Sequence, residues 1–457
     1  MSTPDTDPVL DAGSPAAPKR QLGPSYYKLF SASTISNLGD GVGLIAYPWL
    51  ASAVTRNPIL IALVAVAQRL PWLVFTLPVG VITDRHDRRT LMIWSNVART
   101  VLTLAVAFAV LNRQGTLPGP EVVADDTIAI PTNMILYGVI VLATLLMGIA
   151  EVLYDNSAQT FMPSIVHTEH LEKANGRMWS AELVTNTFIG PPLGALLIAV
   201  SFSLPFFADA ASFAVSAALI ALIPRGRPTA TDDVPERRPW RSEVAEGFRW
   251  LWHHELLRPM AIILGCLNAL GMVTGSILIL YGQEVLHTGP TAFAVLTTGG
   301  AIGGIIGGWT ASSVSKRLGA GPSLWLVLIS SGITTFLVGL MSWWPVVWFL
   351  FAVEMGVGVM WNVITVSLRQ SIIPDHLLGR VNSVYRFFAW GMMPIGSLIG
   401  GLIIVVTDTF ASRELALRMP WLIAGVAYFV LFAFAAPKLT TAKIEAARAN
   451  TIERTIA

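Results

Sequence analysis

Eight charged residues stand inside long apolar stretches of the chain, and they are the residues whose types and positions could do chemistry. They are Asp40, Arg69, Arg99, Glu151, Asp155, Glu182, Asp209 and Glu354. An ionised side chain at the centre of a bilayer costs at least about 2.5–3.5 kcal/mol, so it normally faces a cavity or a partner. Carboxylates in such places can bind and release protons, and guanidinium groups can neutralise them.

Asp40 is the first candidate for proton coupling, because glycines flank it and it lies deepest in its apolar stretch. Glu182, Glu151 and Glu354 are the further candidates, and helical phase leaves open whether Glu182 and Glu354 face one central cavity. The alternative for Asp40 is a static ion pair with Arg69 or Arg99.

A second set of residues lies close to these carboxylates and could line a substrate cavity. The set is Asn37, Arg69, Arg99, Trp179 and Trp361. The two tryptophans could offer a ring face to a cationic or aromatic substrate, and the alternative for them is contact with lipid or packing.

Other kinds of chemistry lack their residues in this sequence. All seven histidines fall in loops or at the ends of apolar stretches, and no set of residues has metal-ligand spacing. The chain has neither the glycine-rich loop that cradles ATP phosphates nor the H-E-x-x-H pair of zinc proteases. We therefore expect no enzyme, no metal and no cofactor, and the net charge of +2 gives no reason to expect nucleic acid.

The elements that must position these residues are long apolar helices. The chain is 54% hydrophobic and 13% charged, whereas soluble domains carry about 25% charged residues. A span of the hydrocarbon core needs about 20 apolar residues. The sequence predicts twelve such helices, at 27–54, 58–82, 90–111, 131–156, 173–199, 203–223, 259–285, 291–313, 322–342, 345–368, 380–407 and 419–436.

Lysine and arginine give the orientation of these helices. Of the 30 Lys and Arg residues, 24 fall in the tails and in the connections on the same side, 4 fall in the opposite loops, and Arg69 and Arg99 lie within helices. Cytoplasmic loops carry the excess of positive charge. The bias predicts a multi-pass protein of a bacterial-type inner membrane with both termini in the cytoplasm.

The twelve helices divide into two sets of six around a long connection. We expect a disordered tail at 1–25, a first half at 26–223, a linker with an amphipathic helix at 224–258, a second half at 259–436 and a tail at 437–457. Gly176-Arg177-x-x-Ser180 recurs as Gly379-Arg380-x-x-Ser383, and Gly80 with Arg88-Arg89 recurs as Gly308 with Lys316-Arg317. Parallel repeats of this kind are a known transporter design, with the substrate site between the repeats.

The connection between the second and third helices reads Gly80-Val-Ile-Thr-Asp-Arg-His-Asp-Arg-Arg89. Asp84 can accept bonds from the exposed N–H groups of a neighbouring helix, while Arg85, Arg88 and Arg89 can pair with carboxylates or lipid headgroups. Such contacts would stabilise one of two conformations, so we predict a gating loop formed by Gly80, Asp84 and the three arginines. We expect Asp155 to pair with one of them. The alternative is a turn whose charges set only the topology.

The fifth helix carries Gly190-Pro191-Pro192-Leu193-Gly194. Small residues allow close helix packing, and proline frees a carbonyl and bends the helix. Gly190, Pro191 and Gly194 therefore form a helix motif that fits a conformational role or, alternatively, simple packing.

These motifs together resemble the major facilitator superfamily. The loop at 80–89, Asn37-Leu-Gly-Asp40, the linker around Glu246-Gly-Phe-Arg-Trp and Gly379-Arg-Val-Asn-Ser are similar to its macrolide-efflux and enterobactin-exporter branch. The resemblance covers about residues 25–436, and Asp87 departs from it, since the family usually has glycine there.

The resemblance implies an all-α membrane protein of twelve helices in two six-helix halves. It also implies proton-coupled efflux of amphipathic small molecules by alternating access, carried out by a monomer whose partners are its substrate, protons and membrane lipids. An importer or a lipid flippase on the same fold, and a receptor or scaffold that does not transport, are the alternatives.

Overall fold

The computed structural model describes residues 22–113, 115–119, 123, 131–167, 170–224 and 240–456. Within these ranges every regular element is helical. The N-terminal tail expected at 1–25 and the first part of the expected linker lie almost wholly outside the described residues.

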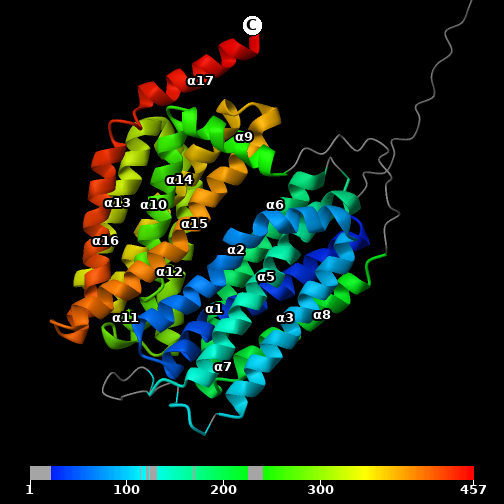
Figure 1. The fold of residues 1–457 in the computed structure, drawn as a ribbon, viewed down its shortest axis with the longest axis vertical. Helices are drawn as coiled ribbons and strands as arrows, with labels where there is room; N and C mark the ends of the chain where they lie inside the picture. The colour runs from blue at the N-terminus through cyan, green and yellow to red at the C-terminus, as the bar shows by residue number, and fades with distance from the viewer. Residues whose placement is uncertain are drawn as a thin grey trace, which may run out of the picture.

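The first six spans form one bundle, drawn in blue to green in Figure 1. Their helices are α1 (Pro24–Val54), α2 (Pro58–Arg85), α3 (Arg88–Leu111), α5 (Met134–Ile165), the fifth span composed of α6 (Leu171–Glu182), the π-helix η2 (Leu183–Ile189) and α7 (Gly190–Val200), and α8 (Leu204–Ala221). We refer to this bundle as the N half.

The last six spans form a second bundle, the C half, in which the seventh span is broken in two. Its helices are α10 (Leu257–Gly275) and α11 (Leu278–Glu284), α12 (Pro290–Leu318), α13 (Ala320–Leu340), α14 (Trp344–Ile372), α15 (Asp375–Asp408) and α16 (Arg413–Ala435). Two further helices, α9 (Trp240–His253) and α17 (Thr441–Ile456), lie against one end of this bundle (Figure 1).

The twelve expected helices are present, and most of their ends fall within a few residues of the expected ones. The largest differences are at α5, which continues to Ile165 beyond the expected end at residue 156, and at α16, which begins at Arg413 rather than 419. Eleven of the described helical spans are long and apolar enough to cross a membrane. The helix α1 falls short of that apolarity because its centre carries serines, glycines and Asp40.

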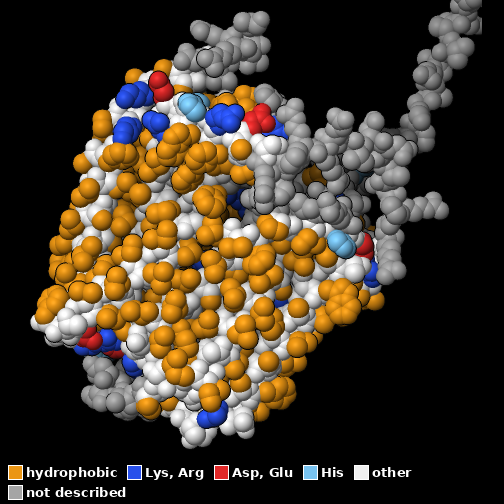
Figure 2. Space-filling view, viewed as in Figure 1, with side chains coloured by type: hydrophobic (Ala, Val, Ile, Leu, Met, Phe, Trp, Pro, Cys, Tyr) orange, Lys and Arg blue, Asp and Glu red, His pale blue; other side chains and the backbone are white. Residues whose placement is uncertain are grey.

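The surface has the pattern of a protein that lipid surrounds. Figure 2 shows hydrophobic side chains over the middle of the visible face, with charged side chains gathered at its ends. We call the end that carries Arg56, Glu284 and Arg413 the Arg56 end, and the opposite end the Arg88 end.

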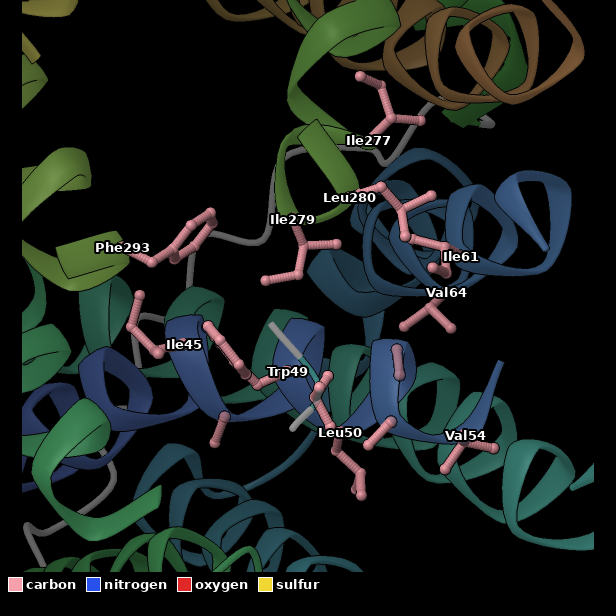
Figure 3. Packing of buried hydrophobic residues seen from close by; sticks show 14 of the residues in the cluster. Ile45, Trp49, Leu50, Val54, Ile61, Val64, Ile277, Ile279, Leu280 and Phe293 are labelled. Carbon is pink, nitrogen blue, oxygen red and sulfur yellow. The ribbon is translucent and has the colours of Figure 1, made fainter. Parts of the chain in front are cut away.

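The two halves meet mainly where α2 packs against α15 and α7 against α12 (Figure 1). Smaller contacts join α1 with α11 and α12, and η2 with α12. Between α2 and α15 the rings of Trp72 and Trp390 stack with centroids 5.5 Å apart. A shared hydrophobic cluster then closes the Arg56 end. Figure 3 shows Ile45 and Trp49 of α1 close to Phe293 of α12 and Ile279 of α11.

Within the N half, α1 and the fifth span approach each other backbone to backbone. A Cβ on Gly190 would lie 2.5 Å from Gly41 Cα, so neither position has room for a side chain. Pro191 has no N–H to donate, and the Gly190 N–H bonds to the Thr185 carbonyl five residues back. This missing donor explains the π-helical turn η2, because a proline cannot complete the ordinary i to i−4 ladder.

Within the C half, α12 and α14 are equally close. A Cβ on Gly303 would lie 1.9 Å from the Ala352 carbonyl oxygen, which a backbone cannot vacate without moving the helix. Tight contact of this kind replaces the hydrophobic effect, which contributes little between helices in lipid.

We therefore expect Gly303→Ala to destabilise the protein by about 1–3 kcal/mol, the usual cost of overpacking. The measurement is thermal unfolding in detergent. The matched control is Gly138→Ala on α5, where an added Cβ meets nothing within 4 Å. Alanine favours a helix over glycine by about 1 kcal/mol, so the control should be neutral or stabilised. Equal stability of the two variants would contradict this account of the helix contact.

Candidate functional site

An ion pair between α1 and α3 occupies the middle of the N half. Arg99, which is 2% exposed, donates through Nη2 to Asp40 Oδ1 and lies 3.4 Å from Ser36 Oγ through Nη1. Its guanidinium also stacks 3.9 Å from the ring centroid of Phe213 on α8. Of the two partners considered for Asp40, the structure has Arg99, and the role of Asp40 in proton coupling stays a prediction.

Arg69, the other partner considered for Asp40 and a candidate for the substrate cavity, lies at the boundary between the halves. Its guanidinium lies 5.8 Å from the ring centroid of Trp390, across the boundary between the halves. It is still near enough for its charge to act on Glu151. Arg69 therefore lies between the N-half charges and the α2–α15 contact.

Four further carboxylates lie around the ion pair. They are Glu151 and Asp155 on α5, Glu182 on α6 and Asp209 on α8, and each interacts electrostatically with Asp40. We call these four with Asp40 the N-half carboxylate cluster. Four of the five carboxylates thus share the guanidinium groups of Arg99 and Arg69 in a place where uncompensated charge is costly. In the described part of the chain, Glu182 interacts with Asp40 but with neither arginine.

Asp209 is a member of this cluster for which no role was predicted. The sequence analysis noted only its position inside an apolar stretch. It is 2% exposed, and its Oδ1 has no hydrogen-bond partner among the described residues. A Cβ on Gly39 would come within 2.5 Å of that oxygen, so glycine at this position lets Asp209 lie against α1. An aspartate inside an apolar stretch is the only sign of this residue in the sequence. Its burial and its missing hydrogen-bond partner become visible only in the folded structure.

The gating-loop residues lie at the Arg88 end, and only some of their side chains are described. Arg88 donates to the Thr160 carbonyl at 2.7 Å, and Arg89 donates to the Ala221 carbonyl. Asp87 caps α3 by accepting from the Thr90 N–H at 3.1 Å. The side chains of Asp84 and Arg85, and the surroundings of Gly80, are outside what the structure describes.

The expected pairing of Asp155 with Arg88 or Arg89 is therefore not found between the described side chains. The reason is the length of α5, which continues to Ile165. Arg88 is level with Thr160, five residues further along, and five residues of α-helix correspond to about 7.5 Å. Asp155 consequently lies deeper than the loop, where Glu151, Arg99 and Asp40 act on it instead.

The remaining predicted residues of the N half are dispersed. Asn37 is partly buried on α1, and Trp179 on α6 is 77% exposed. Glu182 is exposed at the end of the same helix. Gly190, Pro191 and Gly194 form the close contact with α1 described above, and whether they also act in transport stays a prediction.

Glu354 and Trp361 lie together in a cavity of the C half. The cavity has a volume of about 260 Å³ and is lined from α10, α13, α14, α15 and α16. The described lining contains no residue of the N half, and no charge of the N-half carboxylate cluster acts on Glu354. Glu182 and Glu354 are therefore not brought together in this conformation.

A polar network at the Arg56 end ties the halves together, and sequence analysis missed it. Arg56, between α1 and α2, donates to Gln283 Oε1 at 2.7 Å and lies 3.4 Å from Glu284 Oε1. Arg413 donates to Glu284 Oε2 at 2.9 Å and to the Arg56 carbonyl at 3.2 Å. Gln283 donates to Ser52 Oγ at 3.0 Å. We call these five residues the Arg56 network.

The Arg56 network bridges the halves through four contacts: Arg56 with Gln283 and with Glu284, Arg413 with the Arg56 carbonyl, and Gln283 with Ser52. The Glu284 side chain is only 8% exposed, which strengthens its pairing with two guanidinium groups. In the sequence analysis, Arg56 and Arg413 were used only to orient the helices in the membrane. Their partners are more than 100 residues away, so no local spacing could connect them.

Twelve helices in two six-helix halves, with charges inside and a sealed end, define a multi-pass membrane transporter rather than an enzyme. The chain belongs to the Major Facilitator Superfamily, whose sequence profile matches residues 29–397. This confirms the resemblance that the sequence motifs carried, and with it the fold class.

Individual relatives extend this result. The multidrug efflux pump Tap of Mycolicibacterium fortuitum is 24% identical over 423 residues, which cover 88% of this chain and 94% of that protein. The enterobactin exporter EntS of Shigella boydii is 25% identical over 406 residues, which cover 85% of this chain and 88% of that protein. Among solved structures, a bacterial homologue of the iron transporter ferroportin in an inward-facing state has a TM-score of 0.67 at 17% identity, covering 91% of this chain and 100% of that one.

We expect Glu284→Gln to loosen the Arg56 end, because the neutral amide cannot hold both Arg56 and Arg413. Spin labels at Asn112 and Trp343, in a Cys266→Ser background, report the separation of the halves at this end. The ratio of long to short distances should rise about tenfold, which corresponds to about 1.4 kcal/mol.

The control for this experiment is Glu414→Gln. Glu414 pairs with Arg418 on its own helix at 2.8 Å, so removing its charge breaks no contact between the halves. An identical distance distribution for Glu284→Gln and wild type would show that the Arg56 network does not hold this end closed.

Proposed function

We propose that this transporter exports amphipathic small molecules by alternating access and that protons drive the export. The observation that carries the proposal is the N-half carboxylate cluster, in which four of the five carboxylates share Arg99 and Arg69. Ionisable groups inside membrane helices mark proton and substrate pathways. The functions of the relatives, multidrug efflux and enterobactin export, support the direction of transport and the kind of substrate in this proposal.

In this proposal Asp40 is the site of proton binding. Its side chain is 27% exposed, whereas that of its partner Arg99 is 3% exposed, so a proton reaches the carboxylate without passing the guanidinium. Protonation removes the charge that holds Arg99 to α1. Arg99 then interacts with Glu151 or Asp209, the other carboxylates whose charges act on it.

This exchange couples the proton to movement because α1 belongs to the surface between the halves. The same helix contacts α11 of the C half near the Arg56 end and η2 beside Gly190. A change in the contact between α1 and α3 therefore affects both the boundary between the halves and the motif formed by Gly190, Pro191 and Gly194. Rigid-body movement of one half against the other is the usual form of such transitions.

The conformation described here is closed at the Arg56 end. The excess of Lys and Arg at the Arg88 end supports a cytoplasmic position for that end, with both termini inside. On this assignment the protein is closed toward the exterior, and the loop at 80–89 acts when the cytoplasmic side closes. Gly80, Asp84, Arg85, Arg88 and Arg89 are the proposed gating residues, and a single chain performs the cycle.

A lipid flippase is the second candidate, and one groove favours it. The groove has a volume of about 680 Å³, lies between α1 and α6, and is lined mainly by apolar groups, including Tyr27 and Phe30 with Arg177 beside them. This combination suits an acyl chain with an anionic headgroup. Transport of a fluorescent phospholipid between leaflets, in the absence of drug transport, would favour this function over export.

The coupling is tested in proteoliposomes with an imposed pH gradient. We expect Asp40→Asn to reduce gradient-driven transport about tenfold or more, because the amide cannot bind the proton. Downhill exchange of substrate should continue. Asp40→Glu, which keeps a carboxylate beside Arg99, should retain coupling, and the continued downhill exchange of Asp40→Asn shows that loss of the charge does not unfold the protein.

The exposed residue Glu255 provides the control, as Glu255→Gln removes a carboxylate outside the spans. Transport that ignores the pH gradient in the wild-type protein, or that survives unchanged in Asp40→Asn, would refute the proposed coupling.

A further inference from the structure

The cavity around Glu354 has the composition of a binding site, and the proton-coupling scheme does not use it. Its walls come from five helices of one half: α10, α13, α14, α15 and α16. Pockets formed between helices of a bundle, with mainly apolar walls and a few polar groups, are common sites for small molecules. At about 260 Å³, this one holds part of a drug-sized molecule.

Glu354 is the only acidic residue of the described lining, and it has no positive partner there. The lining contains no Lys, Arg or His. No described charge acts on Glu354, whereas in the N half Arg99 and Arg69 serve the carboxylates. Arg369 is on the same helix, but fifteen residues of α-helix, about 22 Å, separate it from Glu354, and it lies over the ring of Tyr385 at 3.9 Å. The carboxylate is thus left without a counter-ion inside the bundle.

Two aromatic side chains stand beside this carboxylate. Glu354, Gly358 and Trp361 are four and seven residues apart on α14, so they share one helix face. Trp361 is 3% exposed, and its indole N–H has no hydrogen-bond partner among the described residues. Tyr428 of α16 lines the opposite side and interacts electrostatically with Glu354. Aromatic rings around a carboxylate are the surroundings that favour an organic cation.

The remaining walls keep the space open and fix its polar groups. Asn268 donates to the Ala389 carbonyl at 2.8 Å, which holds its amide in place. A Cβ on Gly358 would meet nothing within 4 Å, and a Cβ on Gly271 would only touch Tyr428 Oη at 4.0 Å. Glycine at these two lining positions therefore leaves volume that a side chain would occupy.

We propose that this cavity binds the positively charged group of a lipophilic organic cation, with Glu354 as its counter-ion and Trp361 and Tyr428 as its aromatic walls. The proposal rests on the proposed function in assigning the cation to transported substrates. In this scheme the N-half carboxylate cluster binds and releases protons, and the cavity of the C half binds the positive charge of the substrate.

The test measures equilibrium binding of ethidium to the purified full-length protein by fluorescence polarisation, without any gradient. We expect Glu354→Gln to weaken binding about tenfold or more, in line with the coupling of close charge pairs at interfaces. Glu354→Asp keeps the charge and should recover most of the affinity. The charge-matched control, Glu255→Gln, should bind as the wild type does.

A second variant tests the space rather than the charge. Gly358→Val fills the cavity beside Glu354 and should also weaken ethidium binding, while Gly138→Val, at an equally open glycine of the N half, should not. Unchanged affinity in either Glu354→Gln or Gly358→Val overturns the proposal, and so does a wild-type protein that fails to bind ethidium. Unchanged affinity with loss of gradient-driven transport in Glu354→Gln would make Glu354 a proton carrier instead.

Ammonium groups are also carried by lipid headgroups, and two nanodisc compositions distinguish the sources. Both contain phosphatidylglycerol at the same fraction, and the remainder is a non-ionic glycolipid in the first and phosphatidylethanolamine in the second. Equal ethidium affinity in both assigns the cavity to free cations, and weaker binding in the second shows that the same site accepts ethanolamine headgroups. Because no gradient is present, ethidium can bind even if the proposed proton coupling is wrong. The experiment therefore distinguishes failure of the cation site from failure of the proposed function.

Discussion

The constraint on which the N half depends is the burial of Arg99. A guanidinium that is 2% exposed in a bundle surrounded by lipid needs carboxylates close to it, and those carboxylates must come from other helices. Asp40 comes from α1, Glu151 and Asp155 from α5, and Asp209 from α8. One positive charge on α3 thereby holds three neighbouring helices, and any change in which carboxylate it contacts changes the packing of all of them.

The two halves share an architecture and differ in their charge. The N half pairs its guanidiniums with more carboxylates than they can neutralise, whereas the C half has a single carboxylate in a cavity with aromatic walls. Gly80 with Arg88-Arg89 recurs in the C half as Gly308 with Lys316-Arg317, but Asp84 is replaced there by Ser312. The two halves therefore have the same number of spans and close glycine contacts of their own, while their ionisable groups differ.

The sequence was sufficient to predict the helices and part of the candidate site. The predictions that failed did so for physical reasons. Apolar length marks a span, but α5 continues past residue 156 through polar residues, because a helix beyond the apolar core needs no apolar pattern. There Thr160 bonds back to the Asn156 carbonyl at 2.8 Å. Asp87, which departs from the family pattern, is explained by capping, and the rule that Asp precedes a helix could have identified it.

The Arg56 network could not be found in the same way. Arg56 and Glu284 are brought together by the fold of both halves, and the sequence between them contains no repeat that links them. The same holds for the pairing of Asp40, where the sequence left Arg69 and Arg99 as equal choices. Which arginine is level with Asp40 depends on how α2 and α3 pack against α1, and helical periodicity alone does not determine this packing.

The glycine contacts within each half have a kinetic consequence. Gly303 lies against the backbone of α14, and Gly190 against that of α1, at separations that leave no room for a Cβ atom. Such interfaces resist bending and transmit displacement, as close-packed interiors do. In the proposed transport cycle, the slow motion is then the relative rotation of two stiff halves, expected on the microsecond to millisecond scale. Its activation barrier resides in the contacts that must break between those halves, so the turnover rate and the fold's stability can be tuned by different residues.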